Sequence, residues 1–353
     1  MLRESRRCKT RLPRRADNCD SDSERCNRYR LRFVKLRHRN STFLWSWHLP
    51  RCVRSWRVKE QAERTVNPNK GSLSMILVQI SDTHVDASNS LVYGRFNTNT
   101  ALEKAVAVIN AMDPLPDLVL HTGDIASRGN VERYERFREI VEPLQVPIVL
   151  IPGNHDERGA LRQVFSGSTM LPTDGEFLQY VIDDFPVRLI CCDSVIEDET
   201  PGELCPARLN WLSDRLDDAG EQPTIVALHH PPFYSGMTGT TAKGLLRGGL
   251  QFAELLKQHA QVVRVLAGHI HRPITTSFGG TIASSGPTTC YPFGLDMGAD
   301  RVLNIVHEPP AIAIHLWLED ASPTGPGLVS HVLPIGDWEA PIPLLREGKR
   351  VVS

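Results

Sequence analysis

From residue 75 onward, short apolar runs alternate with segments of helical periodicity, and this alternation restricts the chain to an α/β fold. The runs are rich in Val, Ile and Leu and too short for buried helices, so each predicts a strand. The predicted strands are 76–80, 117–121, 146–151, 187–193, 224–229, 262–267 and 280–285. The predicted helices are 100–112, 130–144, 206–220 and 250–260. Nearly continuous apolar strands favour sheets whose faces are covered by helices.

Two regions carry further signals about where elements begin and end. Thr100 and Glu103 have the spacing of a capping box, which predicts that the first helix begins there. The C-terminal stretch is less regular, with strands predicted at 301–306 and 311–318 and a turn or loop at 319–327. A Pro-interrupted, irregular tail is expected to follow.

Charge divides the chain near residue 74. The whole chain of 353 residues has a net charge of −1, but residues 1–74 carry 20 Lys and Arg against 7 Asp and Glu. This segment has no helical or strand period, and we expect a disordered or non-native extension, with Met75 as the natural start of the compact domain. A basic arm for nucleic acid or a membrane surface, and a targeting peptide, are the alternatives. We assign residues 75–345 to one domain and 346–353 to a tail.

The cysteines that follow residue 75 indicate a reducing environment. Cys191 and Cys192 are adjacent, so their side chains should point to opposite faces of a strand. Together with Cys205 and Cys290 they are typical of reduced, buried thiols rather than a disulfide framework, and we expect a cytoplasmic protein. No run of about 18 apolar residues occurs after residue 75, so no membrane span is expected there.

Five of the predicted strands end in Asp, His or Asn. They run into SDTH (81–84), TGD (122–124), GNHD (153–156), HH (229–230) and GHIH (268–271). Each motif alone is typical of an ordinary turn, or at most of half a structural metal site. In open α/β sheets, however, ligands bind beyond the carboxyl ends of the strands, and five such ends can converge on one crevice. The order of the motifs, each behind a strand, therefore predicts one shared site.

This combined pattern resembles that of the calcineurin-like metallophosphoesterases. Within that superfamily, ISDTH, ALHHPP and LAGHIH are most similar to the bacterial class III cyclic-nucleotide phosphodiesterases, and SSGPTTCY (284–291) resembles the segment that follows their last strand. The resemblance covers about residues 75–292. It implies a four-layer αββα sandwich with a binuclear metal centre.

The resemblance also implies a ligand set. The first ion would take Asp82, His84, Asp124 and His271, and the second would take Asp124, Asn154, His229 and His269. Asp124 would bridge the ions, because ions about 3.5–4 Å apart need a shared ligand. Imidazoles at positions i and i+2 of an extended segment point the same way, which explains the spacing in GHIH. Ligation by N and O without thiolate suits Mn, Fe, Zn or Co. His230 would be structural or support a ligand.

His155 is not expected to bind metal. It would contact the substrate phosphate, together with His84, Asn154 and His271, and would protonate the leaving alkoxide. Asp156 could orient His155, or it could cap the helix that follows.

We therefore expect a metal-dependent phosphodiesterase that hydrolyses 3′,5′- or 2′,3′-cyclic nucleotides by attack of a metal-bound hydroxide. Action on glycerophosphodiesters, aryl diesters or phosphomonoesters is the alternative. A nuclease, and hence a nucleic-acid partner, is disfavoured because the domain is acidic and polyanions bind along basic grooves. An interaction scaffold would have gaps in the ligand set, and a structural zinc site would need four closed ligands. The resemblance implies a homodimer or larger homo-oligomer.

Overall fold

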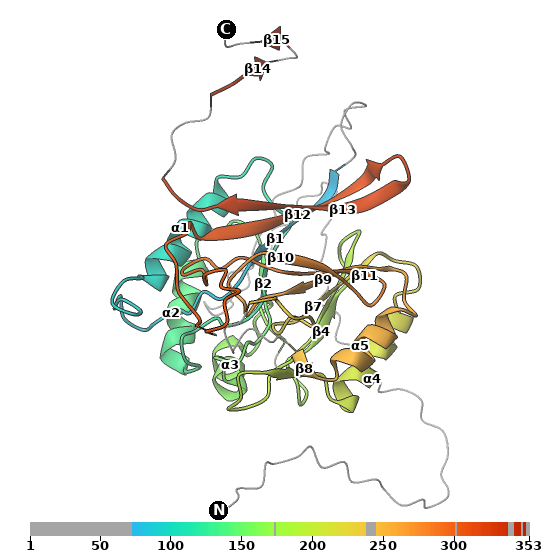
Figure 1. Cartoon of the computed structure of the whole chain (residues 1–353), viewed down its shortest axis with the longest axis horizontal. Coiled ribbons are helices and arrows are strands. Elements are labelled where there is room, and N and C mark those ends of the chain that lie inside the picture. The colour runs from blue at the N-terminus through green and yellow to red at the C-terminus, as the bar shows by residue number, and fades with distance from the viewer. Residues whose placement is uncertain are drawn as a thin grey trace, which may run out of the picture.

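The computed structural model describes residues 73–172, 174–237, 245–300, 302–337, 342–346 and 349–350, and two sheets form its centre (Figure 1). The first sheet has the order β13 (Gly325–Pro334), β12 (Ala311–Ser322), β1 (Leu73–Ile80), β2 (Leu118–His121) and β3 (Ile148–Leu150). The second has the order β10 (Ile274–Phe278), β11 (Thr281–Ser285), β9 (Val262–Ala267), β7 (Thr224–Ala227), β5 (Arg188–Cys191) and β4 (Tyr180–Ile182). Two short pairs, β6 (Gly202–Glu203) with β8 (Leu245–Arg247) and β14 (Leu345–Arg346) with β15 (Lys349–Arg350), lie outside these sheets.

The central strands of each sheet are parallel. β2 pairs in parallel with both β1 and β3, and β7 pairs in parallel with both β5 and β9. Antiparallel strands close the sheets, with β12 beside β1 and β4 beside β5. Parallel neighbours bring their carboxyl ends to one edge, so the loops after β1, β2, β3, β7 and β9 can meet there.

Helices cover the outer face of each sheet, which completes four layers. α1 (Thr98–Asn110), α2 (Val131–Val141) and α3 (Arg158–Phe165) lie on the first sheet, and α4 (Pro206–Asp217) and α5 (Gly249–Leu256) on the second (Figure 1). One core contains residues of α1–α3 and of both sheets, and a second core lies between the second sheet and α4 and α5. Cys191 belongs to the first core and Cys192 to the second, which confirms that they point to opposite faces. The predicted αββα sandwich is thereby confirmed.

Several element boundaries differ from the sequence-based expectation. Asn97 is the N-cap of α1 and its side chain accepts from the Thr100 amide at 3.0 Å, so the capping box predicted at Thr100 is wrong. Residues 302–306 form no strand, and only Ile305 makes a bridge, with Phe293. The turn or loop predicted at 319–327 is confirmed as the turn of a long hairpin, but it is shorter than expected, because β12 runs to Ser322 and β13 begins at Gly325. The strands β4, β10 and β13 were not predicted, nor were the short strands β6, β8, β14 and β15.

The disordered or non-native extension predicted for residues 1–74 falls almost wholly on residues 1–72, which lie outside the described part of the chain. Leu73 and Ser74 belong to β1, where Leu73 pairs with Leu318 and the Ser74 hydroxyl donates to Glu319 Oε1 at 2.6 Å. The first strand thus begins before Met75, and the domain limits of 75–345 stay a prediction. Among the described residues, none of the helices has the length and apolarity needed to span a bilayer.

Candidate metal centre

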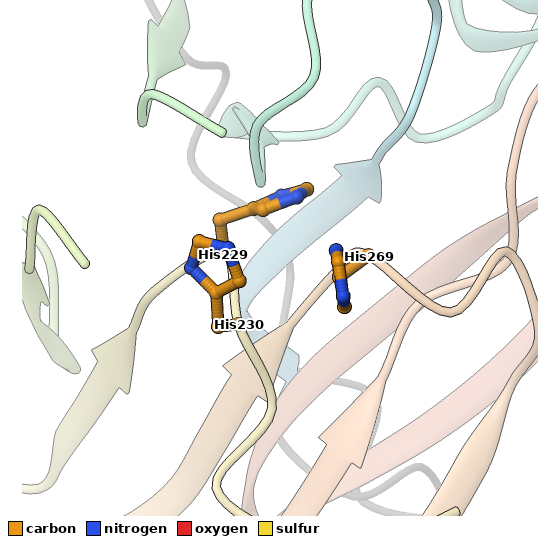
Figure 2. A group of neighbouring side chains, drawn as sticks. All are labelled: His229, His230 and His269. Carbon is orange, nitrogen blue, oxygen red and sulfur yellow. The ribbon is translucent and has the colours of Figure 1, made fainter. Parts of the chain in front are cut away.

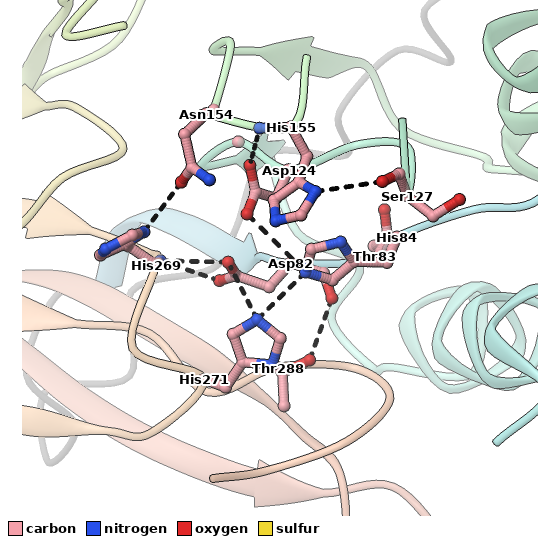
Figure 3. Close-up of polar contacts among 12 residues, drawn as sticks. Asp82, Thr83, His84, Asp124, Ser127, Asn154, His155, His269, His271 and Thr288 are labelled. Atoms are coloured by element: carbon pink, nitrogen blue, oxygen red, sulfur yellow. Dashed lines mark hydrogen bonds and ion pairs between the residues drawn. The ribbon is translucent and has the colours of Figure 1, made fainter. Parts of the chain in front are cut away.

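Five loops at the carboxyl ends of β1, β2, β3, β7 and β9 converge on one buried cluster (Figure 3 shows residues of four of these loops, and Figure 2 those of the loop after β7). All seven residues predicted as metal ligands lie in it: Asp82, His84, Asp124, Asn154, His229, His269 and His271. Six of them are buried, and Asn154 is partly exposed. The prediction that separate strand ends would gather these side chains agrees with this arrangement.

The backbone of the cluster is held in an unusual conformation. Among the described residues, seven that are not glycine have positive φ, and five of these are predicted ligands: Asp82 (52°), His84 (44°), Asp124 (55°), His269 (71°) and His271 (53°). Left-handed backbone at such residues costs energy, and it persists where the surroundings enforce it, typically at functional sites. Two backbone hydrogen bonds join the loop after β1 to the loop after β2: Asp82 N–H donates to Gly123 O and His84 N–H donates to Asp124 O, each at 3.0 Å.

One group of side chains surrounds the space between His84 and His271. Their Nε2 atoms lie 3.1 Å apart, and His271 Nε2 lies 3.5 Å from Asp82 Oδ1. His271 Nδ1 is 2.9 Å from the carbonyl oxygen of Tyr291, which can only accept. Nδ1 therefore carries the proton, and the Nε2 lone pair points into the cluster.

A second group surrounds Asn154 (Figure 2 shows two of its histidines, His229 and His269). Asn154 Oδ1 lies 2.9 Å from His269 Nδ1 and 3.2 Å from His229 Nε2. His229 Nδ1 is 2.7 Å from the Thr122 carbonyl oxygen, so Nδ1 carries the proton and Nε2 faces the group. The amide of His269 donates to both carboxylate oxygens of Asp82 at 3.1 Å, which ties the two groups together.

Asp124 lies between the two groups. Its Oδ2 is 3.7 Å from His84 Nε2, and its Oδ1 is 3.4 Å from His229 Nε2. Burial opposes ionisation of this carboxyl, but the neighbouring His229, His155 and His84 hold the pKa of Asp124 well below its usual range. Burial likewise favours the neutral ring of His229, yet the Asp124 carboxylate outweighs it and raises the pKa of His229 to about 9. The cluster therefore attracts positive charge.

The donor atoms of both groups fit metal ions. Two ring nitrogens 3.1 Å apart would repel if both turned lone pairs toward each other, so either a proton on one of them or a cation bound to both must lie between them. This separation is that of two nitrogens bound to one ion at about 2.0–2.1 Å each. The donors are imidazole, carboxylate and amide oxygen without thiolate, a set that suits Mn, Fe, Zn or Co.

His230 belongs to the same neighbourhood but is held by other partners (Figure 2). Its Nδ1 lies 2.8 Å from Ser194 Oγ, and its Nε2 lies 3.0 Å from the carbonyl oxygen of Thr200. Nε2 must donate to that carbonyl, so Nδ1 accepts from the hydroxyl. Although its ring is near enough to His229 and His269 to join a metal site, both of its nitrogens are engaged, and we assign it a structural role.

His155 lies at the open side of the cluster. Its ring is exposed and stands edge-on to the His84 ring, with centroids 4.9 Å apart. Its Nδ1 donates to the Ser127 carbonyl at 3.0 Å, and its backbone amide donates to Asp124 Oδ1 at 2.9 Å. The remaining ring nitrogen, Nε2, is therefore left for a ligand.

The sequence suggested that Asp156 could orient His155, but the structure shows no hydrogen bond between these two side chains. Its buried carboxylate accepts from the amides of Gly153 (2.8 Å), Ile125 (3.1 Å) and Ala126 (3.3 Å) and from the Tyr134 hydroxyl (3.0 Å). The carbonyl of Ser127 holds the His155 ring instead. Nor does Asp156 cap α3, because the Glu157 side chain accepts from the first amides of that helix. Asp156 joins the loop after β2 to the loop after β3.

Several supporting residues were not predicted from the sequence. His121, at the end of β2, accepts from the Gly123 amide at 3.1 Å and has Nε2 2.9 Å from Thr83 Oγ1. Thr83 in turn donates to the Ile125 carbonyl at 2.8 Å. The ring of Tyr291 stacks on His84, with centroids 5.3 Å apart. A histidine inside the apolar run LVLH was the available signal for His121, since a buried histidine needs partners.

Comparison with known proteins shows which family has a sequence like this one. The family model described as calcineurin-like phosphoesterase matches residues 75–273. A probable glycerophosphodiester phosphodiesterase, GpdQ, of Arcobacter nitrofigilis is 35% identical over 79% of this chain and 100% of its own length. The 3′,5′-cyclic adenosine monophosphate phosphodiesterase CpdA of Pseudomonas aeruginosa is 33% identical over 62% of this chain and 78% of its own.

A cAMP/cGMP dual specificity phosphodiesterase of Mycobacterium tuberculosis is 30% identical, over 68% of this chain and 78% of its own length. Among solved structures, a dimetal phosphatase from Danio rerio has a TM-score of 0.51 at 13% identity, and the match covers 75% of this chain and 100% of the other. This structural likeness supports the fold.

Proposed function

The chain belongs to the calcineurin-like phosphoesterase family and is a phosphodiester hydrolase, and from this premise we propose that it hydrolyses cyclic nucleotides at a binuclear metal centre. The placement of Asp124 carries the proposal. One of its oxygens faces His84 and the other faces His229, so one carboxylate can serve both groups of donors. This is the arrangement that a pair of ions about 3.5–4 Å apart requires.

Asp82, His84, Asp124 and His271 would hold one ion, and Asp124, Asn154, His229 and His269 would hold the other. When bound, the pair would supply an activated water at neutral pH and positive charge for the phosphate oxygens. The carbonyls of Tyr291 and Thr122 fix the tautomers of His271 and His229, so that Nε2 of each ring is free to bind.

His155 would act on the substrate. Its Nδ1–H is engaged by the Ser127 carbonyl, so a second proton on the ring would reside on Nε2. From there it can donate to a phosphate oxygen and then pass the proton to the leaving alkoxide. The hydrogen bond from its backbone amide to Asp124 Oδ1 holds the His155 backbone beside the carboxylate that would bridge the ions. His84, Asn154 and His271 border the same space and would contact the phosphate.

Two substrate classes compete for this site. The relatives from Pseudomonas aeruginosa and Mycobacterium tuberculosis are cyclic-nucleotide phosphodiesterases by name, which supports a 3′,5′- or 2′,3′-cyclic nucleotide. The relative from Arcobacter nitrofigilis is named for glycerophosphodiesters and matches this chain over its own full length, which favours the alternative.

A hydrolysis panel separates the candidates. We expect the enzyme, purified and supplied with Mn²⁺, Zn²⁺, Co²⁺ or Fe²⁺, to act on 3′,5′-cAMP or 2′,3′-cAMP with a kcat/KM at least about tenfold above those for glycerophosphocholine and aryl phosphate monoesters. A higher kcat/KM for glycerophosphocholine would instead identify glycerophosphodiesters as the substrate class. Failure to cleave any diester with any of these metals would refute the proposed function.

A further inference from the structure

A pocket of about 260 Å³ opens beside the metal centre. It lies between the loop that contains Tyr93, Arg95 and Phe96 and the segment that contains Asn304 and His307. Whole small-molecule sites occupy about 300–1,000 Å³, so this pocket has the size of a subsite for one part of a ligand.

The ring of Tyr291 connects the metal centre to residues that line the pocket. On one side its ring stacks on His84 and approaches His271, with centroid distances of 5.3 and 4.8 Å. On the other side it contacts Tyr93 and Phe96, each at 5.7 Å. A substrate whose phosphate is bound at the metal centre would therefore extend past a single aromatic ring, that of Tyr291, to reach the pocket.

The loop that forms the outer wall is held in place by its own backbone. Val92 N–H donates to Phe96 O at 2.8 Å, and Phe96 N–H donates to Val92 O at 3.0 Å. This closed turn forces Tyr93 into left-handed backbone, with φ of 52°, and leaves its side chain 68% exposed. A bulky residue in this conformation is an outlier, and such strain is concentrated at ligand clamps and active sites.

The chemistry of the pocket favours a flat, uncharged group. Phe96 and His307 both line the pocket, and their rings stack with centroids 5.1 Å apart and 25° between them, so a flat group can extend this stack. Arg95 is exposed and makes no ion pair with any residue that the structure describes. Its positive charge repels a quaternary ammonium group such as choline, but its guanidinium plane stacks on or hydrogen-bonds to a base. Asn304 adds a side-chain amide, which can both donate and accept.

We propose that this pocket binds the nucleobase of the substrate, with Phe96 as the stacking residue and Arg95 beside it. The inference rests on the proposed cyclic-nucleotide activity, which it extends by naming the residues that recognise the base. Phe96 then determines specificity between diesters that carry a base and diesters that do not.

Kinetic selectivity tests this role. In Phe96→Ala, kcat/KM for 3′,5′-cAMP should fall about tenfold, mainly through KM, as expected for the loss of one stacked base. The kcat/KM for glycerophosphoethanolamine, a diester without a base, should stay within about twofold of the parent enzyme. Leu250→Ala, which removes an exposed apolar side chain on α5, should change neither substrate. Equal losses for both substrates, or no loss for either, would overturn the assignment.

Binding measurements keep the inference testable if cyclic nucleotides prove not to be substrates. By calorimetry on the metal-loaded enzyme, AMP should bind about tenfold more tightly than ribose 5-phosphate, and Phe96→Ala should bring this ratio close to one. A ratio near one in the parent enzyme refutes the base pocket even where phosphodiesterase activity is present. Absence of all diester hydrolysis refutes the proposed function instead, so the two failures are distinguishable.

Discussion

Replacing Asp156 by Ala tests whether this buried carboxylate joins the two loops that carry Asp124 and His155. The substitution leaves the amides of Gly153, Ile125 and Ala126 without an acceptor, and the Tyr134 hydroxyl must turn elsewhere. An unsatisfied buried donor costs about 1–3 kcal/mol, and four donors lose their partner. Burial and the Asp124 carboxylate raise the pKa of Asp156 to about 6, so removing its charge returns part of this cost. We expect a net loss of about 3 kcal/mol in the free energy of unfolding.

Urea unfolding in the presence of a chelator measures this loss without the contribution of bound metal. The melting temperature should fall by roughly 6–12 °C for a domain of this size. Glu157→Ala is the matched control: it removes the cap of α3, and it should cost about 1 kcal/mol without affecting metal affinity.

The competing explanation, that Asp156 acts by orienting His155, predicts a different result. Under that explanation Asp156→Ala would lower kcat and leave the unfolding free energy within about 1 kcal/mol of the parent. Such an outcome would refute the role assigned to these four hydrogen bonds. A large loss of stability, accompanied by weaker metal binding, would support it.

Further substitutions test the individual roles. Asp124→Ala should abolish activity and metal content together, as elemental analysis and an assay of the same preparation would show; metal content that stays at the parent level would contradict the bridging role. His155→Ala should keep its metals while kcat falls by about 10²–10⁴, and loss of metal would make His155 a ligand rather than a proton donor. His229→Ala should lower the metal content. His230→Ala should keep the metal content but lower the free energy of unfolding, because both ring nitrogens of His230 have buried partners. Loss of metal from His230→Ala but not from His229→Ala would make His230 the ligand. Gly123→Ala places a Cβ against the His229 ring at a φ of +97°, so it should reduce metal binding, and normal metal content would show that the loop can relax.

Much of the site could be predicted because its residues follow apolar strands directly. Asp82 comes two residues after β1 and His269 two residues after β9, so a correct strand assignment also places the side chain. The partners of Asp156 could not be found in this way. Two of them, Ile125 and Ala126, lie 31 and 30 residues earlier in the chain, and the order of strands across the sheet decides that the two loops meet.

The errors in the fold have similar causes. β13 (GPGLVSHVLP) contains glycine, proline and polar residues and lies at the edge of its sheet, where one side needs no partner and the apolar pattern is weak. Residues 302–306 alternate like a strand, yet Leu303, Asn304 and Ile305 line the pocket, and only Ile305 forms a bridge, with Phe293. The start of α1 was misplaced because Asn97 and Thr100 are both good caps, and the tertiary contacts of Asn99 with Asp86 select the earlier one.

The most direct test of the binuclear centre is the electron paramagnetic resonance spectrum of the enzyme loaded with Mn²⁺, recorded together with its metal content. If Asp124 bridges two ions about 3.5–4 Å apart, the protein should bind two Mn²⁺ per chain, and their spins should be exchange-coupled. One ion per chain, or two ions whose spectrum is that of isolated Mn²⁺, would contradict the account.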